Sequence, residues 1–268
     1  MKKIYEKIKK KFISKTIPNV KTFKEADLYC KNRSKIGYES KLLCKYRFEK
    51  LENYISNYGQ TLFTESSNVL IYCLAYYLKK NKGKFPKIVD FGGACGEHIL
   101  FLSRIFGKDI FKSAWIIETK AQVDFSHKYN FSKKLNFSND LRKILIEKNI
   151  DIFFSSCALN YTERPYEILK KVVKKGIPYV CLTRNNFSIN PKSFIQVSNL
   201  SDNGFGKHIT DYGNPLIWYP SQTLSEKKIK DIFISSNYQI IFEENLVNSG
   251  VINSTSNYSK DLVFHLKD

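Results

Sequence analysis

The chain lacks the spacing of cysteines and histidines that marks metal and disulfide-exchange sites. Its six cysteines lie far apart, at positions 30, 44, 73, 95, 157 and 181, and no C-x-x-C pair occurs among them. The four histidines show no metal-ligand spacing either. We therefore expect no bound metal ion, and scattered reduced thiols of this kind are typical of a cytoplasmic protein.

Long apolar runs and phosphate-binding signatures are also missing. No stretch of about 18 apolar residues occurs, so we expect no membrane-spanning helix. The charged start of the sequence lacks the apolar core of a secretory signal. No G-x-x-x-x-G-K-[ST] loop is present, which argues against an NTPase.

Acidic residues are scarce relative to basic ones, and the formal net charge at pH 7 is +19. Residues 1–50 alone contain 16 Lys and Arg residues but only 5 Asp and Glu. Such a charge is compatible with nucleic-acid binding, although no Arg-rich segment or RNA-recognition signature accompanies it. A compositional bias of the source genome is the alternative explanation, so we rank nucleic acid below a small-molecule partner.

An amphipathic helix is predicted for residues 1–13, where Ile4, Ile8 and Phe12 recur at intervals of four among lysines. A helix of this kind can rest on an anionic membrane surface. A frayed tail and a helix docked on the core are the alternatives. The sequence thus leaves open a peripheral position at the inner membrane surface.

Apolar strands and amphipathic helices alternate along the rest of the chain. This alternation predicts an α/β fold with a Rossmann-like, mostly parallel sheet of seven strands, an antiparallel C-terminal edge hairpin and helices on both faces. The predicted strands lie near 87–91, 114–118, 134–137, 151–155, 178–183, 238–244 and 260–267. The predicted helices of this region lie near 97–106, 120–130, 139–149, 164–175 and 223–235.

The chain is predicted to have two parts. Residues 1–80 form a basic helical N-terminal extension that packs on the core, with helices within 22–56 and 66–80. Residues 81–268 form the α/β domain. Within it, residues 184–220 are rich in Asn, Ser, Gly, Pro and aromatic residues, and we expect a long irregular insert there with a functional role.

The segment KIVDFGGACGEH at 87–98 has the pattern of a strand, a tight turn and a helix. The apolar strand leads to Asp90, and Gly92, Gly93 and Gly96 follow. Glycines let the backbone approach a ligand closely, and the next helix offers unpaired N–H groups. The spacing differs from the G-x-G-x-x-G of dinucleotide sites and looks more like the D-x-G-x-G-x-G loop of class I S-adenosylmethionine-dependent methyltransferases. We expect these four residues to bind such a cofactor; a purely structural turn is the alternative.

Two further strand ends are predicted to meet this loop. Glu118 ends the second strand, 22 residues after Gly96, where a carboxylate can accept hydrogen bonds from both ribose hydroxyls. Ser155 and Ser156 end the fourth strand, and small residues at that edge leave room for a ligand. A solvated acid at a strand end is the alternative explanation for Glu118.

An ordered set of segments carries a family resemblance. They are VDFGGACGEH, WIIET, SSCALNYTERPYEIL, LTRNNF, FIQV and PLIWYPSQTLS, within residues 22–245. The set resembles an uncharacterised family of class I S-adenosylmethionine-dependent methyltransferases that is associated with surface-polysaccharide gene clusters. The resemblance implies the methyltransferase fold and S-adenosylmethionine as cofactor. Two features depart from the pattern: Ala94 replaces a loop glycine, and no clear acid follows the third strand, where Asn139 or Asp140 could hold the adenine.

Candidates for the acceptor side lie at and within the insert. A hydroxyl acceptor must lose its proton as it reacts, so we name His208 and Asp211, in GKHITDYG, as candidate bases. Arg184, just after the fifth strand, has the donor geometry to orient an acidic or sugar acceptor. Aromatic residues that could wall the pocket are Tyr161, Tyr212, Trp218 and Tyr219. An ordinary surface or core role is the alternative for each.

The sequence therefore predicts an enzyme, a methyltransferase that O-methylates a saccharide or another small acceptor in surface-polysaccharide biosynthesis. One alternative is an RNA methyltransferase that binds phosphates through its basic N-terminal region. The other is a non-catalytic scaffold of the same fold at the membrane surface.

Overall fold

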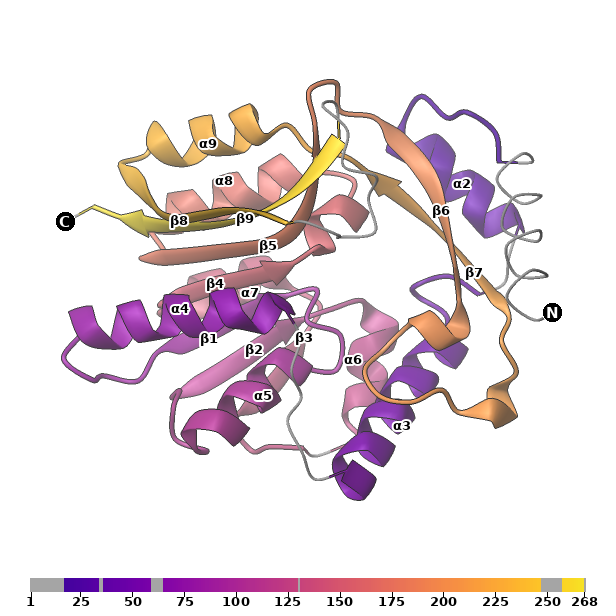
Figure 1. Cartoon of the computed structure of the whole chain (residues 1–268), viewed down its shortest axis with the longest axis horizontal. Helices are drawn as coiled ribbons and strands as arrows, with labels where there is room; N and C mark the ends of the chain where they lie inside the picture. The colour runs from indigo at the N-terminus through magenta and orange to yellow at the C-terminus, as the bar shows by residue number, and fades with distance from the viewer. Residues whose placement is uncertain (1–16, 34–35, 59–64, 130, 247–256, 268) are drawn as a thin grey trace.

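A seven-stranded sheet in the order β3–β2–β1–β4–β5–β9–β8 runs through the centre of the molecule (Figure 1). This computed structural model describes residues 17–33, 36–58, 65–129, 131–246 and 257–267. Strands β1 to β5 are parallel, and β9 is antiparallel to both β5 and β8, which confirms the predicted edge hairpin. The strands are β1 (Lys87–Phe91), β2 (Ser113–Ile117), β3 (Leu135–Ser138), β4 (Ile152–Ser156), β5 (Tyr179–Ser188), β8 (Tyr238–Leu246) and β9 (Asn257–Leu266).

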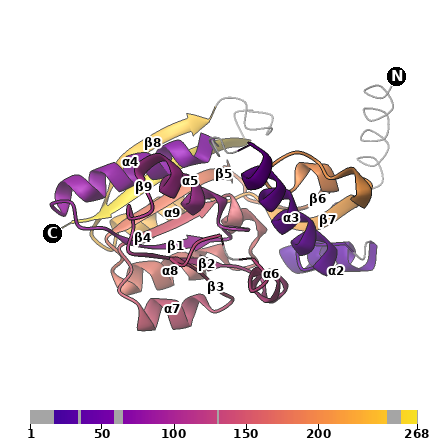
Figure 2. The ribbon, with the colours of Figure 1, turned by 90° about the horizontal axis from the view of Figure 1, so that it is seen from below.

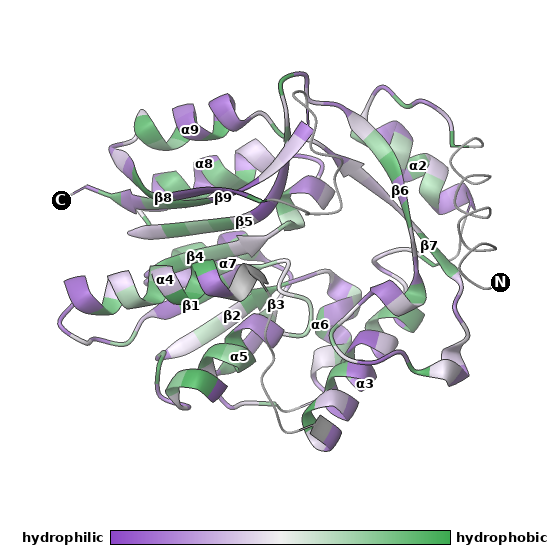
Figure 3. Ribbon diagram, in the orientation of Figure 1, coloured by the Kyte–Doolittle hydropathy of each residue, from purple (hydrophilic) through white to green (hydrophobic). Residues whose placement is uncertain are grey.

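Helices cover both faces of this sheet, so its central strands are apolar along most of their length (Figures 2 and 3). Ile88 of β1 belongs to an apolar cluster with residues of α4 and α5, whereas its neighbour Val89 belongs to a cluster with residues of α7, α8 and α9 on the opposite face. β5 becomes more polar in its carboxyl half, although most of its residues there stay buried. The helices are α4 (Glu65–Lys80), α5 (Glu97–Phe106), α6 (Lys120–Ser126), α7 (Leu141–Glu147), α8 (Pro165–Lys175) and α9 (Glu226–Ile234).

The region expected to be an irregular insert contains a second, two-stranded sheet. β5 continues to Ser188, and β6 (Ser193–Asn199) pairs in antiparallel register with β7 (Leu216–Gln222). We call this pair the β6–β7 arm. Short 3₁₀ helices, η2 (Leu200–Asp202) and η3 (Thr210–Tyr212), lie between its strands. The expectation of an irregular insert is therefore wrong for much of this segment.

The N-terminal helices connect the arm to the sheet. α2 (Phe23–Arg33) packs on the arm, where Cys30 joins an apolar cluster with Ile195 and Trp218. α3 (Lys41–Tyr58) contacts α6 and also holds the chain that follows η2. Its buried Lys50 donates from Nζ to three backbone carbonyls, those of Ser201, Asn203 and Gly204, at 2.9, 2.9 and 3.0 Å. The proposed division of the chain near residue 80 stays a prediction.

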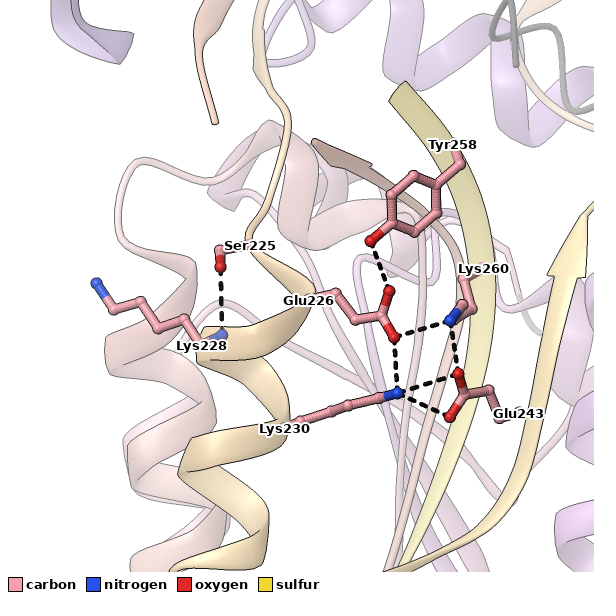
Figure 4. A network of polar contacts seen from close by, with 7 residues as sticks. All are labelled: Ser225, Glu226, Lys228, Lys230, Glu243, Tyr258 and Lys260. Carbon is pink, nitrogen blue, oxygen red and sulfur yellow. Dashed lines mark hydrogen bonds and ion pairs between the residues drawn. The ribbon is translucent and has the colours of Figure 1, made fainter. Parts of the chain in front are cut away.

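A network of charged side chains fixes α9 against β8 and β9 (Figure 4). Glu226 accepts hydrogen bonds from Tyr258 at 2.6 Å and from Lys260 at 2.8 Å, and it pairs with Lys230 at 2.7 Å. Glu243 of β8 pairs with the same two lysines. The network thereby anchors the half of β9 that lies beside the polar end of β5.

The predicted helix over residues 1–13 lies outside the described residues. Within the described part of the chain, none of the helices combines the length and apolar character needed to cross a bilayer.

Candidate active-site cleft

A cleft of about 1660 Å³ opens at the carboxyl ends of the parallel strands. Its walls come from the loop after β1, the end of β2, the segment after β4, and β5. α2, α3 and the β6–β7 arm contribute to the other side. Ligands of open α/β sheets bind at this edge, so the cleft is the candidate site.

The glycine loop after β1 lies at the cleft, and several of its positions have no room for a side chain. A Cβ added to Gly92, which has φ of 71°, would collide with the Cβ of Ala158, and a Cβ on Gly93 would collide with the carboxyl group of Asp90. Both glycines line the cleft. Gly96 does not line it: a Cβ there would lie 2.7 Å from Cδ2 of Leu135, so Gly96 instead allows α5 to pack on the sheet.

Asp90 lies beneath the loop and is fully buried. Neither of its carboxyl oxygens has a hydrogen-bond partner in the described structure, and the residue does not line the cleft. Burial, together with the negative charges of Glu97 and Glu118, raises the pKa of Asp90 well above its usual value. The carboxyl group of Asp90 thus packs against Gly93 of the loop, and a direct contact with a ligand stays a prediction.

Glu118 lies at the end of β2 and lines the cleft beside the loop. Its Oε1 accepts the backbone N–H of Ala94 at 3.0 Å, and its Oε2 accepts that of Thr119 at 2.9 Å. Each carboxylate oxygen has a second lone pair, so hydroxyls of a ligand can still donate to it. Burial raises the pKa of Glu118, and the charge of Arg47 and the two backbone donors oppose that rise.

Three residues other than glycine adopt left-handed backbone conformations around the cleft. Ala94, Cys157 and Arg184 have φ of 48°, 60° and 54°, and all three line it. They follow β1 and β4 or lie within β5 at its cleft end. Backbone strain of this kind persists where the surroundings enforce it and is concentrated at functional sites.

Arg47 of α3 is a site residue that sequence reasoning missed. Its side chain is buried, lines the cleft and lies 4.7 Å from the centre of the Tyr38 ring. The Nε of Arg47 has no hydrogen-bond partner in the described structure. A buried cation with a spare donor beside the glycine loop is suited to bind a carboxylate. No local motif in the sequence marks this residue, because α3 reaches the loop only in the folded chain.

Three tyrosine rings pack together at the cleft. The ring centres of Tyr38, Tyr161 and Tyr219 lie 4.7 to 5.5 Å apart. All three line the cleft, as does Trp218. Tyr212 does not, and its hydroxyl donates to Glu49 instead. Three of the four predicted aromatic residues therefore lie at the cleft.

The two serines at the end of β4 face opposite sides of the sheet. Ser156 lines the cleft, and its Oγ accepts a hydrogen bond from Nε of Arg184 at 3.0 Å. Ser155 does not line the cleft, since its hydroxyl donates to the carbonyl of Phe91 at 3.2 Å. The structure thus brings Ser156 and Arg184 together with Gly92, Gly93 and Glu118.

The candidate bases from the insert lie away from these residues. The Nδ1 atom of His208 lies 2.8 Å from the hydroxyl of Tyr46, and Asp211 is exposed in η3. Neither is among the residues that line the cleft. His98, to which sequence reasoning gave no role, does line it and packs edge-on against the ring of Phe154. Burial lowers the pKa of His98 to about 3, and the charge of Arg184 contributes, so its imidazole is neutral.

The described residues contain no group of three or more His, Cys, Asp or Glu side chains able to hold a metal ion.

Comparison with known proteins supports the assignment of the fold. No family model and no curated protein matches the sequence. Among solved structures, an S-adenosylmethionine-dependent methyltransferase from Clostridium acetobutylicum superposes with a TM-score of 0.50 over 84% of this chain and 100% of that one, at 13% sequence identity. The chain has the Rossmann-like class I methyltransferase fold.

Two other solved structures overlap less well. The N-terminal domain of EvdMO1 with bound S-adenosylhomocysteine gives a TM-score of 0.47 over 77% of this chain and 83% of that one, at 12% identity. Magnesium protoporphyrin IX methyltransferase from Synechocystis with bound S-adenosylmethionine gives a TM-score of 0.44 over 85% of this chain and 98% of that one, at 9% sequence identity.

Proposed function

We propose that this protein is an S-adenosylmethionine-dependent methyltransferase that acts on a small-molecule acceptor. The observation that carries the proposal is the glycine loop, which faces the cleft at Gly92 and Gly93 and is hydrogen-bonded to Glu118 at the carboxyl edge of a class I methyltransferase sheet.

The residues around the cleft fit the parts of this cofactor. Glu118, which lines the cleft, would accept hydrogen bonds from the ribose hydroxyls. Asn139 and Asp140, which follow β3, also line the cleft and would hold the adenine. Arg47 supplies the cation for the carboxylate of the methionine part, beside the glycine loop. Each assignment uses a side chain or backbone that already faces the cleft.

The cofactor would supply an electrophilic methyl group, and the chain must position the acceptor and receive its proton. A hydroxyl acceptor that took the methyl group would have to give its proton to a base of the chain, and the broken sulfur–methyl bond would leave S-adenosylhomocysteine. His98 lines the cleft, unlike His208 and Asp211, and is therefore the better-placed candidate base, although its lowered pKa makes its imidazole a weak one. His208 and Asp211, which do not line the cleft, stay predictions.

The acceptor is proposed to be a saccharide, used in surface-polysaccharide biosynthesis at a cytoplasmic or inner-membrane location. The family resemblance and the aromatic wall of Tyr161, Trp218 and Tyr219 support this choice. Sugar rings pack against aromatic faces because their C–H surfaces are apolar. A second candidate, RNA methylation, is supported by the net charge of +19. RNA binding would weaken steeply as salt concentration rises.

Calorimetric titration with S-adenosylmethionine and S-adenosylhomocysteine tests the proposed function. We expect saturable binding that Glu118→Ala weakens at least about tenfold, because hydrogen bonds to a charged group are lost. The matched control is Glu163→Ala, an exposed acid that does not line the cleft. A folded protein that binds neither compound would refute the proposal and favour the scaffold alternative.

A further inference from the structure

Arg184 places an unpaired positive charge in the cleft. Its Nε donates to Ser156, and its backbone N–H donates to Oδ1 of the buried Asp261 at 2.6 Å. None of the ion pairs within the described residues includes Arg184. The side chain is exposed and lines the cleft, so its terminal N–H groups remain available to a ligand.

The backbone at Arg184 directs this side chain into the cleft. β5 and β9 shift register between Leu182 and Asn185, and Arg184 lies in that bulge with φ of 54°. A bulge changes the direction of a side chain relative to the regular strand. The hydrogen bond to Asp261 holds the strained backbone in place. A glycine would be the ordinary residue at such a position.

The surroundings of Arg184 place its charge beside the candidate base. Phe154 and Ser156 are two residues apart on β4 and therefore point to the same face of the sheet. His98 packs on Phe154, and Arg184 binds Ser156. An acceptor group bound by Arg184 would thus hold the rest of the acceptor next to His98 and the aromatic wall.

We propose that Arg184 binds an anionic group of the acceptor, a carboxylate or a phosphate, so that the acceptor is an acidic sugar or a sugar phosphate. This inference rests on the proposed function, because it concerns the acceptor side of the same cleft. The planar fork of a guanidinium group matches both anions with two parallel hydrogen bonds, and it gains little from a neutral hydroxyl.

Ligand-observed NMR titrations at constant ionic strength test the proposal, with and without saturating S-adenosylhomocysteine. The probes are D-glucuronate, D-glucose 1-phosphate and D-glucose. We expect at least one anionic probe to bind about tenfold or more tightly than glucose, and the tighter of the two identifies the anion. Arg184→Gln should abolish this preference, and Arg184→Lys should keep part of it. The matched control Arg164→Gln removes an exposed arginine outside the cleft and should keep all of it.

Equal affinity for the three probes, or no binding of either anion, would overturn the inference. Retention of the preference in Arg184→Gln would overturn it as well. A loss of S-adenosylhomocysteine affinity in Arg184→Gln would assign this arginine to the cofactor instead. The wild-type titration with S-adenosylhomocysteine reports separately on the proposed function, since the anion preference is also measured without that compound.

Discussion

Single residues at the cleft depart from the conformations that their side chains favour. Ala94, which replaces a glycine in the loop pattern, has φ of 48°. A left-handed conformation costs a residue with a Cβ about 1–2 kcal/mol relative to glycine. Its backbone N–H must nevertheless point at Glu118, and this hydrogen bond fixes the loop beside β2.

We expect Ala94→Gly to raise the free energy of unfolding by about 1 kcal/mol, because it relieves that strain. Denaturant unfolding monitored by circular dichroism measures the change. Ala121→Gly, within helix α6, is the matched control and should lower stability by about 0.5–1 kcal/mol. Destabilisation by Ala94→Gly would show that the left-handed backbone carries no strain at this position.

The raised pKa of Asp90 predicts that this residue contributes less to the free energy of unfolding as the pH rises. Its pKa is raised in the folded state by burial and by Glu97 and Glu118, so folding favours the protonated form. Stability from this group is complete below its unfolded pKa of about 4 and falls as the pH rises towards the folded pKa. Unfolding free energies of the wild type and Asp90→Asn, measured from pH 4 to pH 8, should therefore diverge in favour of the variant as the pH increases. Parallel curves would contradict a raised pKa at the buried Asp90.

The candidate site could be predicted from sequence only where its residues are close in the chain or follow a strand pattern. Gly92, Gly93 and Glu118 belong to such patterns and lie at the cleft. No sequence pattern marks Arg47 or His98 as a site residue. Arg47 comes from the separate helix α3, and His98 has the position of an ordinary residue of α5. Conversely, the position of His208 in a polar loop suggested a catalytic base, whereas in the fold this histidine contacts the hydroxyl of Tyr46.

Among the elements, η1 (Ala158–Tyr161) connects the cleft edge of the sheet to the β6–β7 arm. The buried Asn160 within it donates to the carbonyls of Asn186 and Gln222 at 3.0 and 2.7 Å and accepts the N–H of Asn186 at 3.1 Å. One amide group thus joins η1, β5 and β7. The cleft geometry depends on this junction because Tyr161 follows directly and Tyr219 lies in the arm.

Asn160→Asp should weaken this junction by about 2–3 kcal/mol, since the two N–H donors to the carbonyls of Asn186 and Gln222 are lost at a buried position. The expected readout is a lower free energy of unfolding, together with faster hydrogen exchange in β6 and β7 than in β1 and β4. Asn139→Asp, at an exposed position, is the control and should change neither. Uniform exchange across both sheets would mean that Asn160 does not hold the arm.

The network that joins α9 to β8 and β9 predicts sensitivity to acid (Figure 4). Burial alone would raise the pKa of Glu226, but hydrogen bonds from Lys230, Lys260 and Tyr258 outweigh it and lower the pKa to about 2. Stability from a depressed carboxyl pKa is present above the unfolded value of about 4.3 and is lost as the pH falls towards 2.

Glu226→Gln should therefore cost roughly 2 kcal/mol at pH 7 and progressively less as the pH falls from 4.5 towards 2. Urea unfolding at several pH values measures the difference between the two proteins. Glu167→Gln, at an exposed pair on α8, is the control and should cost little. A constant difference between wild type and Glu226→Gln down to pH 2 would contradict the lowered pKa.

The elements that sequence patterns predicted are those with long apolar runs. α5 begins and ends where the periodicity indicated, because its buried face is continuous. The β6–β7 arm escaped prediction because the segment that contains it is rich in Asn, Ser, Gly and Pro, and because the helices that cover its apolar residues, α2 and α3, lie far away in the sequence. The alternation of apolar and polar residues in β6 and β7 is short, and the polar segment between the two strands made it hard to recognise.

At the scale of the whole molecule, the sheet order follows from the connections. Right-handed crossovers between parallel strands and a terminal hairpin leave few alternatives to β3–β2–β1–β4–β5–β9–β8. The acceptor could not be predicted in the same way, since it depends on how α2 and the arm face the sheet. At 13% sequence identity, the likeness to a solved methyltransferase extends to the fold and not to the acceptor.

The most direct test of the central claim is a crystal structure of the protein grown with S-adenosylhomocysteine. The account predicts the ligand in the cleft, with its ribose hydroxyls on Glu118 and its carboxylate beside Arg47, while Arg184 still faces open space. An empty cleft at saturating ligand concentration, or ligand bound away from Gly92 and Gly93, would contradict it.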